Sequence, residues 1–131
     1  MLRIMMVTMT IVLMFQPHLM GEEKAVIAVA SDGETLEAAV SQIAARASYF
    51  LIVDSEGKLM EAVENPYKDN RGGVGVSAAN FLSGKNVTAV VAGSVGNKMR
   101  NALDAQEITY YEFVGSVEEA IRKILEKEDQ T

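Results

Sequence analysis

Apolar residues occur along the chain both in short continuous runs and in longer helical repeats. Five runs have the length and bounding turn residues of β-strands: Ala25–Ala30, Tyr49–Val53, Leu59–Glu64, Val87–Ala92 and Ile108–Val114. Three later segments place apolar residues three or four positions apart, which is typical of helices with one buried face: Val74–Leu82, Val95–Leu103 and Val117–Leu125. The pattern therefore predicts an α/β fold.

The order of the strands in the sheet follows from how much of each strand must be buried. The first, second and fourth runs are almost wholly apolar, so they need cover on both faces and should be central. The third and fifth carry glutamates and suit the edges. Asp54–Lys58 is typical of a hairpin turn in which Gly57 adopts a positive φ. Later connections through helices imply right-handed parallel crossovers. We predict a five-stranded mixed sheet of order 3-2-1-4-5, with helices on both faces.

Two helix ends and one intermediate segment carry further signals. Ser116-x-x-Glu119 is a capping box that starts the last helix, and Gly84 is a stop signal for the first. Residues 34–47 are ambiguous. Their apolar residues have helical spacing and Ser31-x-x-Glu34 is a second candidate capping box, so a full helix here would permit a parallel crossover to the second strand.

Residues 1–20 differ from the rest of the chain. They hold six of the eight methionines, and Arg3 is their only charged side chain. The apolar run Ile4–Phe15 is too short for a bilayer span, which needs about 20 residues. Three interpretations stay open: an extension upstream of a natural start at Met20, a signal or membrane-surface segment, or a packed helix. We expect residues 1–20 to lie outside the fold and residues 21–131 to form one domain.

Composition excludes several classes of chemistry. The chain has 131 residues, 49% of them hydrophobic, and a net charge of −6. A general nucleic-acid binder is not expected, because such proteins carry a basic surface. The chain has no cysteine, which excludes disulfides, thiolate metal sites and a cysteine nucleophile. The one histidine, His18, lies in the N-terminal segment, so a Ser-His-Asp set is not available in the expected domain.

A ligand of an open α/β sheet binds beyond the carboxyl ends of the strands, where neighbouring connections diverge. In the predicted order this point lies between strands 1 and 4, at the loops Ser31–Gly33 and Gly93–Asn97. The second loop leads into a helix whose free N–H groups favour an anion. Lys98, Arg100 and Arg46 add positive charge. The alternative is that Gly93 and Gly96 only permit a tight turn.

Two other groups of residues are candidates for function. The polar connection of residues 65–73 is either a functional loop or a flexible link into the next helix, and its Arg71 is either an anion contact or a solvated surface charge. Asp32, Glu61 and Asp104 suggest a nuclease with a carboxylate-bound metal, but Glu61 fits better as an edge-strand charge and Asp104 as part of the polar face of a helix. An enzyme acting on phosphorylated small molecules is a further alternative, which rests only on the anion-favouring helix start.

Several segments together resemble a known family. They are AVASDG at 28–33, VSQIAARASYFLIV at 40–53, ENPYKDNRGGVG at 64–75, AGSVGN at 92–97 and residues 110–120, and their order and spacing are more specific than any one of them. Over about Lys24–Leu125 the chain resembles the dinitrogenase iron–molybdenum cofactor biosynthesis family, which includes NifX, NifY and the C-terminal domain of NifB. The resemblance is to its small stand-alone members.

The resemblance implies a three-layer α/β/α fold with a ribonuclease H-like motif, sheet order 3-2-1-4-5 and strand 2 antiparallel. It also implies that residues 34–47 are mostly loop with a short helical turn. By resemblance, the protein is a cytoplasmic, non-catalytic carrier or accessory protein for an iron–sulfur or iron–molybdenum cofactor or its precursor. Its partners would be metallocluster biosynthesis or acceptor proteins, with no nucleic acid and no stable membrane span.

One segment departs from the family pattern. Family members commonly have Ser-Pro-His-Phe-Gly-Arg-Ala before the second strand, whereas this chain has SQIAARA at 41–47, with Gln42 at the histidine position. Glutamine is a poorer ligand than imidazole for a soft cluster. The departure leaves three alternatives open: cradling by N–H groups and arginine, a changed ligand, or an interaction module that has lost cluster binding. The candidate cofactor-binding residues are Ser31, Asp32, Gly33, Gln42, Arg46, Arg71, Gly93, Gly96 and Asn97.

Overall fold

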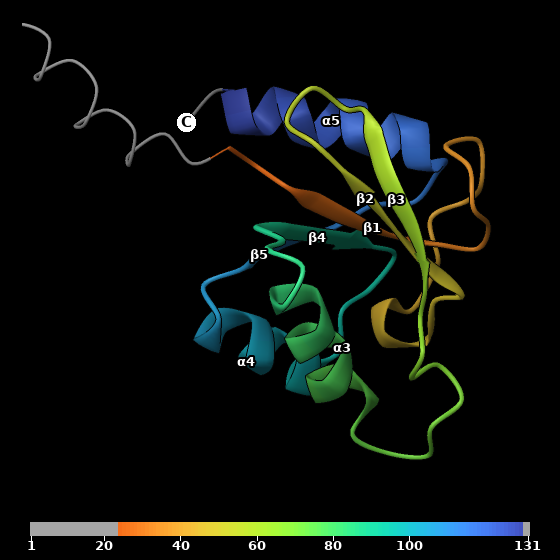
Figure 1. Ribbon diagram of the computed structural model, residues 1–131, viewed down its shortest axis with the longest axis vertical. Coiled ribbons are helices and arrows are strands. Elements are labelled where there is room, and N and C mark those ends of the chain that lie inside the picture. The colour runs from red at the N-terminus through yellow and green to blue at the C-terminus, as the bar shows by residue number, and fades with distance from the viewer. Residues whose placement is uncertain (1–23, 130–131) are drawn as a thin grey trace, which may run out of the picture.

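The computed structural model describes residues 24–129, which form a five-stranded mixed sheet between two helical layers (Figure 1). The strands are β1 Ile27–Ser31, β2 Tyr49–Val53, β3 Leu59–Glu64, β4 Ala89–Ala92 and β5 Thr109–Glu112. The helices are the 3₁₀ turn η1 Ala44–Arg46 and the α-helices α3 Val74–Ser83, α4 Asn97–Ala105 and α5 Val117–Asp129. The N-terminal extension predicted for residues 1–20 lies outside the described residues.

The sheet order is β3-β2-β1-β4-β5, which confirms the order predicted from burial. β1 runs parallel to β4, and β4 runs parallel to β5. β2 is antiparallel to both β1 and β3, as the family resemblance implied. The carboxyl ends of β1, β4 and β5 therefore meet at one edge of the sheet.

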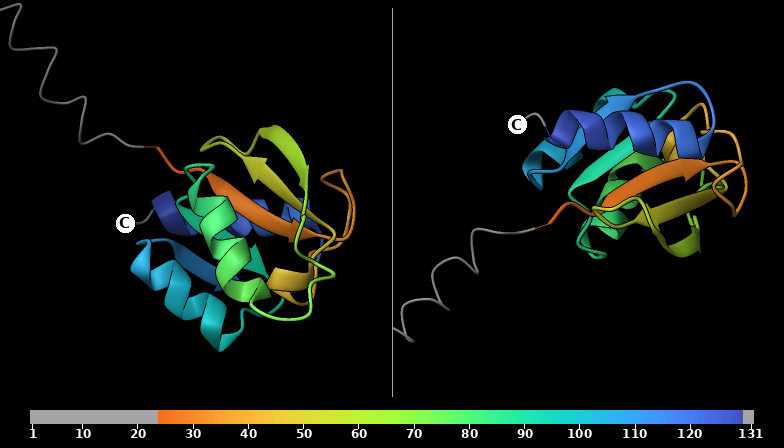
Figure 2. Two further views of the ribbon diagram at one scale, coloured as in Figure 1. Left: turned by 60° about the horizontal axis from the view of Figure 1, so that its bottom comes forward. Right: turned by 90° about the horizontal axis from the view of Figure 1, so that it is seen from above.

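Helices cover both faces of the sheet (Figure 2), and each face has its own hydrophobic core. On one face, α3 and α4 pack against side chains such as Phe50, Ile52 and Val90. On the other face, α5 packs against side chains such as Ile27 and Leu51. β1 and β4 are buried throughout and β2 is buried except at Tyr49, because both faces of these strands meet a helical layer.

The hairpin turn and the Ser116-x-x-Glu119 capping box are confirmed, whereas Ser31-x-x-Glu34 caps no helix, because Ser31 ends β1 and its hydroxyl bonds Gly33. Gly57 has a φ of 84° in the β2–β3 turn, where the Asp54 carboxylate accepts the N–H groups of Glu56 and Lys58. These two hydrogen bonds hold the pKa of Asp54 below its usual value, and the bond from the Lys58 N–H has the larger effect. Ser116 and Glu119 exchange side-chain to backbone hydrogen bonds of 3.1 and 2.9 Å. No helix within residues 24–129 has both the length and the apolarity that a bilayer crossing requires.

Segment bounds are the main correction to the sequence analysis. β1 begins at Ile27 instead of Ala25, β4 begins at Ala89 instead of Val87, and β5 is confined to Thr109–Glu112. Helix α4 begins at Asn97 instead of Val95. Val95 precedes the helix because its N–H donates to the Glu112 carboxylate, although its side chain is buried as the apolar spacing required.

A full crossover helix over residues 34–47 is not formed. Main-chain groups in this segment pair with distant parts of the chain instead: the Ser41 N–H donates to Ala30 O, and the Ala44 N–H donates to Ser94 O. Its apolar residues divide between the two cores, with Val40 on the α5 side and Ala44 on the α3/α4 side. Tertiary pairing thus overrides the helical spacing, and only η1 remains.

Candidate functional site

The carboxyl ends of β1 and β4 are crossed by the main chain of residues 39–44, which we call the crossing segment. Val40 forms a bridge with Ser31 at the end of β1, and Ile43 forms a bridge with Ser94 just beyond β4. The Gly93 N–H donates to Ser41 O at 2.8 Å. A ligand therefore cannot lie directly on this point of the sheet edge, and the space around it is divided into two cavities.

The first, the rim cavity, has a volume of about 400 Å³. It is lined by Asp32, Val40, Gln42, Gly93, Ser94, Phe113 and Val114. The Ser41 hydroxyl donates a 2.6 Å hydrogen bond to the Asp32 carboxylate. Because its only ionisable lining residue is an acid, this cavity does not favour an anion.

The second cavity, the groove, has a volume of about 330 Å³ and lies where α3 and α4 begin beside η1. Its lining consists of Ile43, Ala45, Arg46, Gly73, Val74, Gly75, Val76, Gly96, Asn97, Lys98 and Met99. The two helix starts are in close contact, because a Cβ on Gly75 would lie 3.1 Å from the Met99 backbone nitrogen. Both helix N-termini therefore open into the same small space.

Both helices start at a glycine and neither start is capped by a side chain. Gly73 and Gly96 hold the N-cap positions of α3 and α4, and a Cβ on either would meet no atom within 4 Å. The first three amides of each helix, 74–76 and 97–99, have no hydrogen-bond acceptor within residues 24–129. Six N–H donors and two helix dipoles thus face the groove, which is the arrangement that favours an anion.

Two cationic side chains line the groove. Lys98 comes from the first turn of α4, and Arg46 comes from η1 on the opposite side. The Arg46 guanidinium also donates to Lys68 O and Asn70 O at 2.7 and 2.6 Å. Arg46 therefore adds charge to the groove and holds the loop that leads from β3 to α3.

Asn65 fixes the position of η1 through buried hydrogen bonds. Its side chain is buried, with 3% exposure, and its amide donates to Ala45 O and Ala47 O at 3.0 and 2.9 Å. Its carbonyl accepts the Tyr67 N–H at 3.0 Å. One side chain thus joins the turn that carries Arg46 to the start of the 65–73 loop.

The loop before α4 is held by an ion pair. Glu112 accepts the Val95 N–H at 3.0 Å and lies 3.2 Å from the Arg100 guanidinium, which itself donates to Val95 O. The hydrogen bonds from the Val95 N–H and from Arg100 hold the pKa of Glu112 below its usual value, and the bond from Val95 has the larger effect. Together these contacts of Glu112 and Arg100, which we call the clamp, fix the positions of Gly96 and of the α4 start.

A lowered pKa makes the clamp pH-dependent. A carboxylate whose folded pKa is depressed stabilises the fold above its unfolded pKa of about 4.3, and that contribution is lost as the pH falls through the folded value. We expect Glu112→Gln to lower the unfolding temperature at pH 7 and the difference from wild type to shrink below pH ~4. Thermal unfolding from pH 7 to pH 3 measures this, with the exposed Glu37→Gln as control. An undiminished difference at the lowest pH would contradict a role for the charge.

The predicted site residues fall into three sets, and Arg71 belongs to none of them. Arg46, Gly96 and Asn97 line the groove, whereas Asp32, Gln42 and Gly93 line the rim cavity. Ser31 and Gly33 close the turn after β1, since the Ser31 hydroxyl bonds both the N–H and the C=O of Gly33. Arg71 is exposed and makes no ion pair or hydrogen bond within residues 24–129.

Sequence reasoning did not include several groove residues among the candidates. Gly73, Val76 and Ile43 were missed, and Lys98 was noted only as nearby charge. The signal for Gly73 was available, because a Gly-Gly pair directly before an apolar helical repeat marks an uncapped helix start. Ile43 had no such signal, since its exposure of 52% depends on the path of the crossing segment.

The donor set decides how a metallocluster would be held. No three His, Cys, Asp or Glu side chains of residues 24–129 come together in a way that could bind a metal ion, so Asp32, Glu61 and Asp104 do not form a metal site. The groove offers N–H groups, an arginine and a lysine, which fit an anion held without metal–ligand bonds. The residues therefore fit a cluster bound as an anion.

Comparison with protein families connects this geometry to a known group. A model described as dinitrogenase iron-molybdenum cofactor matches residues 23–127. The chain belongs to this family. No curated protein matches it.

Solved structures agree with the family assignment. The apo form of the orange protein from Desulfovibrio gigas is 27% identical, with a TM-score of 0.75 over 82% of this chain and 92% of that one. A candidate NifB protein from Thermotoga is 38% identical, with a TM-score of 0.67 over 78% and 88%. A candidate dinitrogenase from Methanocaldococcus jannaschii, at 18% identity and a TM-score of 0.58 over 82% and 93%, shares the fold. The predicted family and α/β fold are confirmed; the ribonuclease H-like label stays a prediction.

Proposed function

We propose that this family member is a non-catalytic carrier or accessory protein. It holds an iron–sulfur or iron–molybdenum cofactor, or a precursor of one, in the groove. The observation that carries the proposal is the opening of two helix starts, each with a glycine N-cap and no side-chain cap, into one cavity beside Arg46 and Lys98. The family is named for the same class of cofactor.

Electrostatics favour a polyanion at this place. Each helix start carries roughly half a positive charge, and two starts with two cationic side chains oppose the acidic balance of the whole chain. The apolar side chains of Ile43, Val74 and Val76 displace water from part of the groove, which strengthens the attraction between the cargo and the amides. A metal–sulfur cluster with net negative charge suits such a lining.

The groove lining has no cysteine or histidine, and its one thioether, that of Met99, is buried with 1% exposure, which supports reversible binding. Hydrogen bonds and charge would hold the cargo, so release to an acceptor would require no metal–ligand bond to the lining to break. In this proposal Arg46, Gly96 and Asn97 contact the cargo, and Arg71 contributes exposed positive charge from the 65–73 loop. The remaining candidates shape the neighbouring rim: Asp32, Gln42, Gly93, Ser31 and Gly33.

Anaerobic titration tests the proposal directly. Soluble iron–sulfur clusters and thiomolybdate are added separately to the full chain, and the absorption spectrum and the unfolding temperature are recorded. We expect new absorption bands and a higher unfolding temperature with at least one of them, because a ligand of the folded state raises its stability. Arg46→Ala should weaken both signals. An unchanged spectrum and unfolding temperature with both probes would contradict the proposal.

A second candidate function is an interaction or regulatory module that has lost cluster binding. Gln42 stands at the position of the family's histidine, and three exposed apolar side chains, Ile43, Val76 and Val114, surround the two cavities. Exposed apolar residues near each other are typical of protein interfaces. Capture of a metallocluster biosynthesis or acceptor protein by an Arg46→Ala, Gly96→Val double variant, at wild-type level, would favour this function over the carrier.

A further inference from the structure

β5 is an edge strand with its outer side open. It pairs with β4 alone, in parallel register from Ala89–Thr109 to Ala92–Glu112. The N–H groups of Thr109 and Phe113 donate to β4-side carbonyls at 3.1 and 2.9 Å. Because backbone groups alternate along a strand, the N–H and C=O groups of Tyr110 and Glu112 point away from the sheet.

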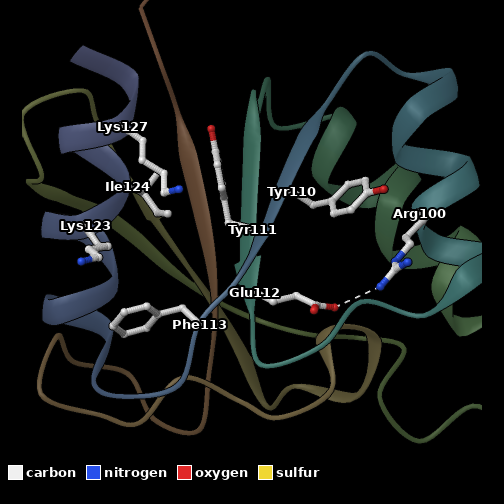
Figure 3. A pocket seen from close by; sticks show the side chains of 8 residues that line it. All are labelled: Arg100, Tyr110, Tyr111, Glu112, Phe113, Lys123, Ile124 and Lys127. Carbon is white, nitrogen blue, oxygen red and sulfur yellow. Dashed lines mark hydrogen bonds and ion pairs between the residues drawn. The ribbon is translucent and has the colours of Figure 1, made fainter. Parts of the chain in front are cut away.

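A cavity of about 560 Å³ surrounds this open edge, and we call it the edge cavity (Figure 3). Its residues are Arg100, Tyr110, Tyr111, Glu112, Phe113, Lys123, Ile124 and Lys127. Tyr111 and Phe113 extend toward α5, while Tyr110 and Glu112 extend toward α4. The edge of β5 is therefore reachable between two helices and is flanked by aromatic rings on both faces.

The charge of the edge cavity is opposite to that of the chain. Lys123 and Lys127 lie one turn apart on α5 and are exposed, and both line the cavity. Glu112 is its only acid, and that acid is already paired with Arg100 at 3.2 Å. Two lysines thus leave a net positive edge on a protein of net charge −6.

We propose that the edge cavity binds an extended acidic segment of a partner protein, which adds to β5 as a sixth strand. The outward N–H and C=O groups of Tyr110 and Glu112 pair with the main chain of that segment. Its acidic side chains on one face lie against Lys123 and Lys127. Both chains are extended and rise by about 3.3 Å per residue, so the part of the partner segment that pairs with β5 has as many residues as β5 itself.

Charge distinguishes this occupant from a second copy of the chain. Two β5 edges paired about a two-fold axis would bring the lysines of both copies to the same interface, and like charges oppose such pairing. The edge cavity shares no lining residue with the groove. Variants of Lys123 and Lys127 leave the groove lining and the Glu112–Arg100 pair unchanged, so the interaction and the proposed carrier function can each fail without the other.

The test uses a synthetic acetylated peptide of alternating valine and glutamate, with a peptide of alternating valine and lysine as control. Amide exchange of the full chain is followed by NMR. We expect the acidic peptide to slow exchange at the Tyr110 and Glu112 amides, with little change at Thr109 and Phe113, which already bond to the β4 side. The basic peptide should not slow exchange at either site.

Charge reversal provides the matched variants. Lys123→Glu with Lys127→Glu should lower the affinity for the acidic peptide about tenfold or more. Lys24→Glu with Lys58→Glu makes the same change in net charge on exposed residues outside the cavity, and should change the affinity less than about twofold. Equal binding of both peptides, equal loss in both double variants, or no slowed exchange at millimolar peptide would overturn the proposal. Concentration-dependent protection of the same amides without peptide would also overturn it, in favour of self-pairing.

Discussion

Gly96→Asp is expected to weaken anion binding in the groove by roughly a hundredfold without weakening the fold. Gly96 already has N-cap geometry, with φ −70° and ψ 162°, and a side chain there meets no atom within 4 Å. An aspartate would accept the free amides of α4 itself, which stabilises a helix start, and would place a negative charge where the anion binds. Losing charge-assisted hydrogen bonds and adding repulsion should cost about 3 kcal/mol of binding free energy, or roughly a hundredfold in affinity.

Titration with the same clusters and thermal unfolding measure the two effects together. Gly96→Ser is the matched control, since serine caps the helix without a charge and should reduce affinity less than aspartate does. Retained cluster binding by Gly96→Asp, with an unfolding temperature equal to or above wild type, would show that the α4 start does not contact the anion.

Asn65→Ala is expected to cause the largest loss of stability. The change leaves Ala45 O, Ala47 O and the Tyr67 N–H without their partner at a site that is almost fully buried. Unpaired buried polar groups cost about 1–3 kcal/mol each, so we expect a total of about 3 kcal/mol after partial relaxation and hydration. Denaturant unfolding measures it, and affinity for the anion should fall as well because η1 carries Arg46.

The matched control is Asn101→Ala, at an exposed position on α4. It should change the free energy of unfolding by less than about 0.5 kcal/mol. Asn65→Asp separates geometry from volume. Aspartate keeps the size and the acceptor for Tyr67, but it cannot donate to the two carbonyls. Wild-type stability of either Asn65 variant would contradict the role given to this side chain.

The sheet order was predictable because burial separates central strands from edge strands and the hairpin joins the second strand to the third. Runs such as those around Val29 and Val91 are apolar at every position, so they need two covered faces, whereas Glu61 and Glu112 tolerate only an edge. The absence of a helix over residues 34–47 was not predictable from the residues, because their apolar spacing is helical and only pairing with Ala30, Ser94 and Ser116 overrides it. Long-range pairing leaves no periodic signal in a sequence.

The candidate site was predictable in its chemistry more than in its position. The glycine-rich start of α4 and Arg46 indicated an anion, and Gly96 and Arg46 line the groove. The expectation that a ligand binds beyond the carboxyl ends of the strands placed it between β1 and β4. The crossing segment occupies that place. A main chain that spans two strands could not be inferred from composition. Gln42 and Ile43 are neighbours in sequence, yet they line different cavities.

The contact between the two helix starts has a consequence for the size of the cargo. Gly75 lets the backbones of α3 and α4 touch, and a methyl group at this position would press on the Met99 nitrogen and Cβ, each 3.1 Å away. The side chain of residue 75, a single hydrogen atom in glycine, therefore sets the distance between the N-terminal amides of α3 and those of α4. A larger side chain at residue 75 would push the two helix starts apart and so change the size of the cluster that the groove could hold.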